Sequence, residues 1–310
     1  MWYLHNQKGP ECDLFRAFCE KGHYGGRTKP TNTRQGIYAV APSGEFLASV
    51  NTNDAKAMAR MLTKALEAWD ALPKERRFME KPPAADPEGR WRTEKWHPSD
   101  GLVLRQFVRD LPREKPGADT QRERYFTKAW NQDFAWFRKA EARSFLPEKP
   151  EAGARRDVPE ALVRRLARFH LIDIVRGQTS SFPDACVEKA ELSVEVTAVE
   201  GDVVSIKLAG ATTTRQKMST GVKGYGDMND PKERERGYEA KLLGRATYDL
   251  QKEKFVAFEL VAVGSRWGGT LYNGRGDDLD PAPMGIVFTL AGEQPADHVA
   301  PAFVWEYGWK

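Results

Sequence analysis

The spacing of apolar residues changes from a helical period to a strand period after residue 177. On both sides of a turn at residues 200–202, every second residue is apolar: Leu192, Val194 and Val196 before it, Val204, Ile206 and Leu208 after it. A period of two places these side chains on one face of a strand, so the segment predicts a hairpin with one buried face.

Strand-like spacing continues toward the C-terminus. It marks strands within residues 238–248, 255–264, 286–290 and 303–309, the last of which carries Phe303, Trp305, Tyr307 and Trp309. Six strands with no long helix between them predict an antiparallel sheet, either curved or closed like a barrel. The four aromatic residues would either fill the core of this sheet or line a ligand cavity inside it, and the core is the simpler explanation.

A helix is predicted to precede the sheet. Asp157, Pro159 and Glu160 resemble a helix start, with a capping carboxylate and a proline in the first turn. Apolar residues then follow at helical spacing, and His170 lies on their side, so we expect it to be a hydrogen-bonded core residue. We therefore predict a domain over residues 158–310, formed by one helix and an antiparallel β-sheet.

Residues 74–157 are predicted to be a linker followed by a helical segment. Charge and proline dominate residues 74–90, and the pattern of residues 91–112 is typical of either strand or helix. Residues 122–145 carry aromatic side chains among Arg and Lys, which predicts an amphipathic helix that covers the sheet. The same residues could stack on nucleic acid, but a covering helix explains them without a ligand.

Residues 1–73 are predicted to form a separate unit of helix, hairpin and helix. A short helix at residues 11–21 leads to a strand at residues 36–40, a turn at residues 42–44 and a returning strand at residues 45–50. Asn53 or Asp54 would cap the next helix, which carries an apolar stripe and stops at Pro73.

This order resembles the second half of a thioredoxin-like fold. The segment from Gln35 to Leu47 is similar to the closing hairpin of that family, with the last helix after it and Pro30 before it. The family's Cys-x-x-Cys is absent, since the residue three after Cys12 is Phe15, and the preceding βαβ half does not fit in the available residues. The predicted fold class is therefore α+β: a truncated thioredoxin-like N-terminal unit, a helical middle segment and a C-terminal antiparallel β-sheet or barrel-like domain.

Two of the three cysteines and two of the five histidines lie near the N-terminus, in the order His5, Cys12, Cys19, His23. On a helix, Cys12 and Cys19 share a face, and His23 lies one turn after Cys19. Thiolate and imidazole ligands suit a zinc or copper ion, and Cys12 could instead be a reactive redox thiolate with Cys19 as its partner. The alternative is that both cysteines are buried as small apolar residues.

Two further polar motifs are candidate sites. His97 and Asp100 lie three residues apart in a predicted turn and could act as a general base or metal ligands, although such an aspartate more often bonds the turn backbone. Asp277, Asp278 and Asp280 could hold Ca²⁺, but their spacing lacks the EF-hand order, so an acidic solvent loop is preferred. His298 is expected to be exposed.

Composition limits the functional classes. The 48 basic and 44 acidic residues give a net charge of +4, with both signs interspersed, so nucleic acid is not an expected partner. No apolar run is long enough to span a membrane. The first residues lack the features of a signal peptide, which indicates a cytoplasmic protein unless the chain is a trimmed, exported form.

Two functional hypotheses follow. The first is a thiol- or metal-dependent protein, redox or metal-binding, centred on Cys12 and Cys19 with His5 and His23 as ligands or bases. The second is a non-catalytic protein that binds a small molecule or a protein through its C-terminal β domain. Substrate, metal identity and oligomeric state do not follow from the sequence.

Overall fold

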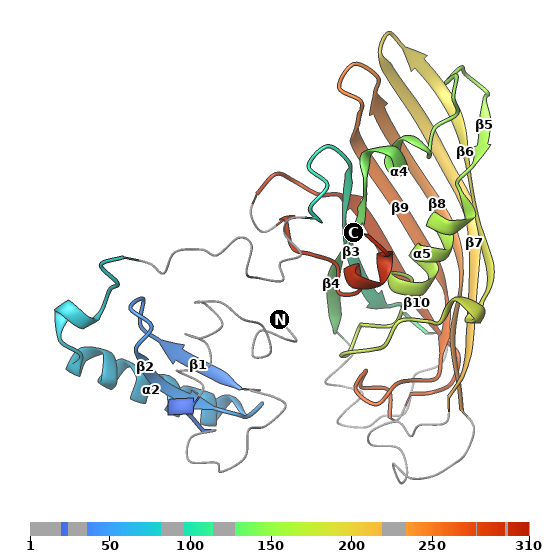
Figure 1. Ribbon diagram of the computed structural model, residues 1–310. Helices are drawn as coiled ribbons and strands as arrows, with labels where there is room; N and C mark the ends of the chain where they lie inside the picture. Colours follow the sequence, from blue (N-terminus) through green and yellow to red (C-terminus); the bar gives the residue numbers. More distant parts are fainter. Residues whose placement is uncertain are drawn as a thin grey trace. The chain divides into compact units, whose positions relative to one another are not determined.

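The computed structural model describes residues 20–23, 36–81, 96–113, 128–218, 234–276, 278–294 and 297–309 (Figure 1). The chain divides into two compact units, Met1–Arg92 and Thr93–Lys310. Among the described residues no helix is both long and apolar enough to cross a membrane.

The first unit contains the hairpin and the helix that the sequence predicts. Strands β1 (Ile37–Val40) and β2 (Phe46–Val50) pair antiparallel, and α2 (Ala55–Ala71) packs on them. Asp54 caps this helix, because its carboxylate accepts a hydrogen bond of 2.6 Å from the Ala57 N–H. A short 3-10 helix, η2 (Lys74–Arg76), follows Pro73.

The second unit is built on one eight-stranded sheet in which every neighbouring pair is antiparallel. Across the sheet the order is β4-β3-β10-β9-β8-β7-β6-β5. In chain order the strands are β3 (Leu102–Asp110), β4 (Trp130–Phe137), β5 (Arg155–Asp157), β6 (Val187–Glu200), β7 (Val203–Met218), β8 (Arg234–Asp249), β9 (Lys254–Trp267) and β10 (Ala282–Leu290).

The two faces of this sheet differ in character. Figure 1 shows a curved sheet with α4 (Lys139–Arg143) and α5 (Glu160–Phe169) on its concave side. Along β9, Phe258 and Leu260 are buried against this side, while Glu259 and Val261 between and beyond them are exposed. We call the concave side the inner face and the opposite side the outer face. The main core lies between the inner face and α5, which contributes Leu162, Val163 and Leu166.

The predicted fold class is wrong. The chain is mostly β, and its centre is a large antiparallel sheet rather than a helical middle segment beside a thioredoxin-like unit. The predicted helix at residues 122–145 is strand β4 followed by the short α4 in its described part. Ala135 and Phe137 pair with Leu104 and Leu102 and point into the main core, whereas Phe134 and Trp136 point to the opposite side and are buried against the C-terminal turn. Aromatic side chains favour such a pleated surface, and this preference outweighs the apparent helical period.

Two predicted boundaries are also wrong. Asp157 does not cap a helix: it is the last residue of β5, and α5 begins at Glu160 after Pro159. The predicted C-terminal strand is instead a 3-10 helix, η6 (Val304–Tyr307). The hairpins β6–β7 and β8–β9 and the strand β10 are confirmed, and so is the antiparallel character of the sheet.

Candidate functional site

The predicted N-terminal cluster lies mostly outside the described residues. This applies to His5, Cys12 and Cys19, and to the predicted helix except for Glu20 and Lys21, which are helical. His23 is described: its Nδ1 lies 2.8 Å from the Ser49 hydroxyl, and its ring stacks on Tyr38 at 5.1 Å between centroids. In the part of the chain that the structure describes, no group of three or more His, Cys, Asp or Glu residues could hold a metal ion. The thiol or metal role stays a prediction.

Within the predicted acidic loop, Asp278 is bound by arginines, whereas Asp280 is exposed to solvent as predicted. Asp278 is buried, and its carboxylate accepts hydrogen bonds from Arg113, Arg266 and Arg275. Gly276 and Asp278 belong to the connection between β9 and β10, and Asp277 lies outside the described residues. An acidic solvent loop is therefore the wrong interpretation for Asp278, and the arginines already occupy the oxygens that a Ca²⁺ ion would need.

Arg275 is the centre of this ion network and is fully buried. Its guanidinium donates to Asp110 at 2.6 Å and to Asp173 at 2.7 Å, and so links the end of β3 to the segment after α5. Burial by itself raises the pKa of Asp110, but the hydrogen bond and charge of Arg275 outweigh it and lower that pKa. The network is a structural clamp on one end of the sheet.

His97 is brought against another histidine. The ring centroids of His97 and His298 are 4.2 Å apart, and His97 also meets the edge of the Trp136 ring at 5.2 Å. Burial, with a smaller contribution from the charge of His298, lowers the pKa of His97. His298 is exposed, as predicted, and its neighbour Asp297 pairs with Arg105. Two imidazoles without a third ligand do not make a metal centre here.

The C-terminal aromatic residues fill a core rather than line a cavity. Trp309 is buried, and Trp305 and Tyr307 pack with it against Phe134 and Trp136 of β4. This confirms the simpler of the two interpretations.

The outer face carries a continuous row of apolar side chains that sequence reasoning did not single out. Cross-strand pairing places one apolar residue from each of five neighbouring strands side by side: Phe107, Val287, Val261, Leu243 and Ala209. We call this set the apolar row. Leu243 exposes 67% of its surface and Val261 37%, and the adjacent Val263 exposes 46%. Large apolar side chains in such a continuous exposed patch mark an interaction surface more often than scattered ones do.

Charged residues of both signs flank the apolar row. On one side the pairing aligns a charged row: Glu195, Lys207, Arg245, Glu259, Thr289 and Arg105, of which only Thr289 is uncharged. Within it, Arg245 donates to Glu259 at 2.7 Å, and Lys207 lies 3.1 Å from Glu195. On the other side of the apolar row, Glu191, Lys241 and Arg109 alternate with small or apolar residues.

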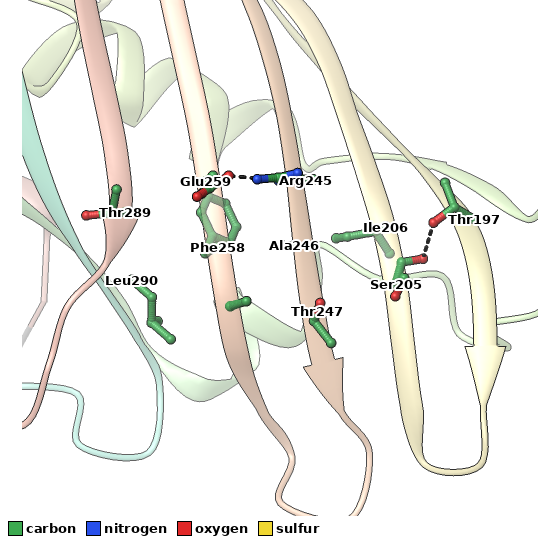
Figure 2. A pocket seen from close by; sticks show the side chains of 11 residues that line it. Thr197, Ser205, Ile206, Arg245, Ala246, Thr247, Phe258, Glu259, Thr289 and Leu290 are labelled. Atoms are coloured by element: carbon green, nitrogen blue, oxygen red, sulfur yellow. Dashed lines mark hydrogen bonds and ion pairs between the residues drawn. The ribbon is translucent and has the colours of Figure 1, made fainter.

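A recess of about 590 Å³ lies beyond the charged row, toward the hairpin ends of the strands (Figure 2). Short side chains form its floor. Ser205, Thr247 and Ala257 lie on the same face as the charged row, two residues further along their strands. Residues of β6, β7, β8, β9 and β10 line the recess: Thr197, Ser205, Ile206, Arg245, Ala246, Thr247, Ala257, Phe258, Glu259, Thr289 and Leu290.

A sequence signal for this face did exist. In residues 255–263 apolar residues occupy both odd and even positions. Val261 and Val263 therefore lie on the face where a half-buried strand would carry polar residues. The alternation of Phe258, Leu260 and Ala262 accounts for the core only. That these outward residues meet Leu243 and Phe107 depends on strand register, which one sequence does not reveal.

The chain matches no protein-family model, no curated protein and no solved structure.

Proposed function

We propose that this chain is a non-catalytic binding protein that docks another folded protein on the outer face of its second unit. The observation that carries the proposal is the apolar row, whose central members Leu243 and Val261 are exposed on an antiparallel sheet and flanked by charged residues of both signs. Side chains on strands are held by the hydrogen-bonded ladder, so the face offers a preorganised surface.

The charge pattern favours a protein partner over other classes. Arg245 and Lys207 lie beside Glu259 and Glu195, so the face has no continuous positive stripe of the kind that nucleic acid or an anionic membrane surface requires. An exposed apolar centre with a polar rim is the usual anatomy of a protein–protein interface. Full burial of one exposed leucine side chain stabilises by about 1.5–3 kcal/mol, so Leu243, which exposes 67% of its surface, would be the strongest anchor of the row.

The experiment selects binders from a displayed random peptide library against the wild-type chain and tests them on two variants. Leu243→Asp places a charge in the apolar row, and Leu66→Asp is the matched control, because Leu66 on α2 exposes a similar 65% of its surface. We expect the selected peptides to bind Leu243→Asp at least about tenfold more weakly and to bind Leu66→Asp like the wild type, as loss of a buried apolar anchor implies. Peptides that bind both variants equally well contradict the proposal.

A further inference from the structure

We infer that the partner is a second copy of this chain, and that the two outer faces pack across a two-fold axis parallel to the strands, between β8 and β9. The inference rests on the proposed function, since it names the occupant of the same face. It is carried by the arrangement of charges about the centre of the sheet.

The axis follows from the strand order. The order β4-β3-β10-β9-β8-β7-β6-β5 has four strands on each side of the boundary between β8 and β9. A two-fold axis along this boundary places β8 over β9 of the second copy, β7 over β10, and β6 over β3. In a face-to-face pair related in this way, each residue meets the residue at the same height on the matching strand, as an isologous interface requires.

The central contact is complementary under this operation. Arg245 on β8 and Glu259 on β9 are directly paired in register, so they stand at one height on opposite sides of the axis. Arg245 of each copy therefore faces Glu259 of the other, and the two in-chain ion pairs become a four-membered network. Leu243 faces Val261 of the second copy at the neighbouring height, so the apolar row is buried at its centre.

The peripheral charges match as well. Glu195 on β6 lies in the row of Arg105 on β3, and Glu191 lies in the row of Arg109. Under this operation Glu191 faces Arg109 of the second copy, and Glu195 faces Arg105, which also pairs with Asp297 of its own chain. Complementary signs across an interface fix its register and exclude alternatives, because juxtaposed like charges cost several kcal/mol.

The dimensions fit a stable dimer. Six strands spaced about 4.8 Å apart, over ten residues of about 3.3 Å each, present roughly 900 Å². A specific interface needs about 800 Å² from each partner. The arrangement keeps the strands of the two copies close to parallel at the axis, within the roughly 30° at which aligned sheets pack. Since the outer face is convex, contact starts at the central strands β8 and β9, which carry Leu243 and Val261.

Charge reversal tests this arrangement by complementation. The wild-type full chain is studied by light scattering after size exclusion and by native mass spectrometry, together with Arg245→Glu and Glu259→Arg. Each single variant puts like charges opposite each other, and we expect its dimer to be weakened about 100-fold, since repulsion replaces attraction at two symmetric sites. An equimolar mixture restores opposite charges at both sites, so we expect a heterodimer with nearly wild-type affinity. Circular dichroism checks that the variants fold. We expect them to fold, because Arg245 and Glu259 form an exposed ion pair, and such pairs contribute little to stability.

Leu243→Asp and Leu66→Asp complete the design. We expect a monomer for the first and a wild-type dimer for the second. A dimer that resists Leu243→Asp, or single variants that the mixture does not restore, would overturn the two-fold model. A monomeric wild type whose selected peptides still require Leu243 overturns the second copy as partner and leaves the proposed function standing. A monomeric wild type whose selected peptides bind Leu243→Asp as tightly as the wild type overturns both the second copy as partner and the proposed function.

Discussion

The Nε2 atom of His170 lies 2.5 Å from the phenolic oxygen of Tyr307 and so joins the end of α5 to the C-terminal turn. Tyr307 also stacks on Phe169, and the guanidinium of Arg165 lies over its ring at 4.5 Å. These contacts explain why the last aromatic residues are not a strand: they cap the end of a helix and cover β4. The sequence analysis correctly predicts that His170 is a hydrogen-bonded core residue.

The buried His170 makes stability fall in acid. Burial, with a smaller contribution from the charge of Arg165, lowers its pKa to about 3, from 6.5 in an unfolded chain. The unfolded state therefore binds the proton first, and stability is lost as pH falls below 6.5. By pH 5 the loss attributable to this group is about 2 kcal/mol. Chemical denaturation at pH 7 and pH 5 should show that His170→Gln reduces the difference between the two values; an unchanged difference would contradict the assignment.

Asp133 acts in the opposite direction over the same range. Desolvation raises its pKa to about 7, although the N–H groups of Phe134 and Ala302 lower it in part. The folded state then holds a proton that the unfolded state releases above pH 3.8, so stability is lost as pH rises from about 4 to 7. Asp133→Asn should remove this loss. The free energy of unfolding of the variant, compared with that of the wild type, should therefore be higher at pH 7 than at pH 4.5. Asp100→Asn, the same substitution at an exposed aspartate, serves as control.

How much of this fold the sequence predicts depends on how local the signal is. The hairpins around Val194 and Phe258 follow from period-two spacing within single segments. The segments around Trp136 and Trp305 are assigned the wrong secondary structure, because aromatic residues among charged ones suit either a helix or a strand. Packing between β4 and the C-terminal turn decides which of the two forms.

The sites depend on distant parts of the chain. Arg275 meets Asp110 and Asp173, which are 165 and 102 residues away in sequence, so an acidic motif near Arg275 could not reveal its partners. The apolar row is likewise visible only once the register of five strands is known. Local spacing therefore predicts β6–β10 as strands, whereas the chemistry of this chain depends on residues that are far apart in sequence.

Arg275 should be one of the most sensitive positions in the second unit. Arg275→Met leaves Asp110 and Asp173 buried without their shared partner, and breaking a buried ion pair on one side costs about 3–5 kcal/mol. Arg155→Met removes an exposed pair with Glu195, and such pairs contribute about 0–1 kcal/mol. Urea unfolding of both variants compares the two. Similar losses would mean that the network is not the clamp described above.

The cysteines provide a test between the two functional hypotheses. The binding proposal expects Cys12→Ser with Cys19→Ser to leave the oligomeric state and the selected-peptide affinity unchanged, because neither residue belongs to the outer face. Metal analysis of protein purified without chelator and native alkylation rates are measured on the same samples. A stoichiometric metal lost in Cys12→Ser, or a rapidly alkylated Cys12, would instead support the thiol- or metal-dependent hypothesis.

Trp309 tests whether the C-terminal turn is an integral part of the core. Only 9% of its surface is exposed, Tyr307 meets its ring edge-on at 5.1 Å, and the guanidinium of Arg138 lies over it at 4.7 Å. Truncation of a packed tryptophan to alanine costs about 3–5 kcal/mol, so Trp309→Ala should destabilise the second unit by an amount in this range. Trp130→Ala is the matched control, since that ring is 60% exposed at the edge strand β4 and its loss should cost below about 1 kcal/mol. Denaturant unfolding followed by far-ultraviolet circular dichroism measures both variants. Equal costs for the two tryptophans would mean that the turn packs on the sheet without stabilising it.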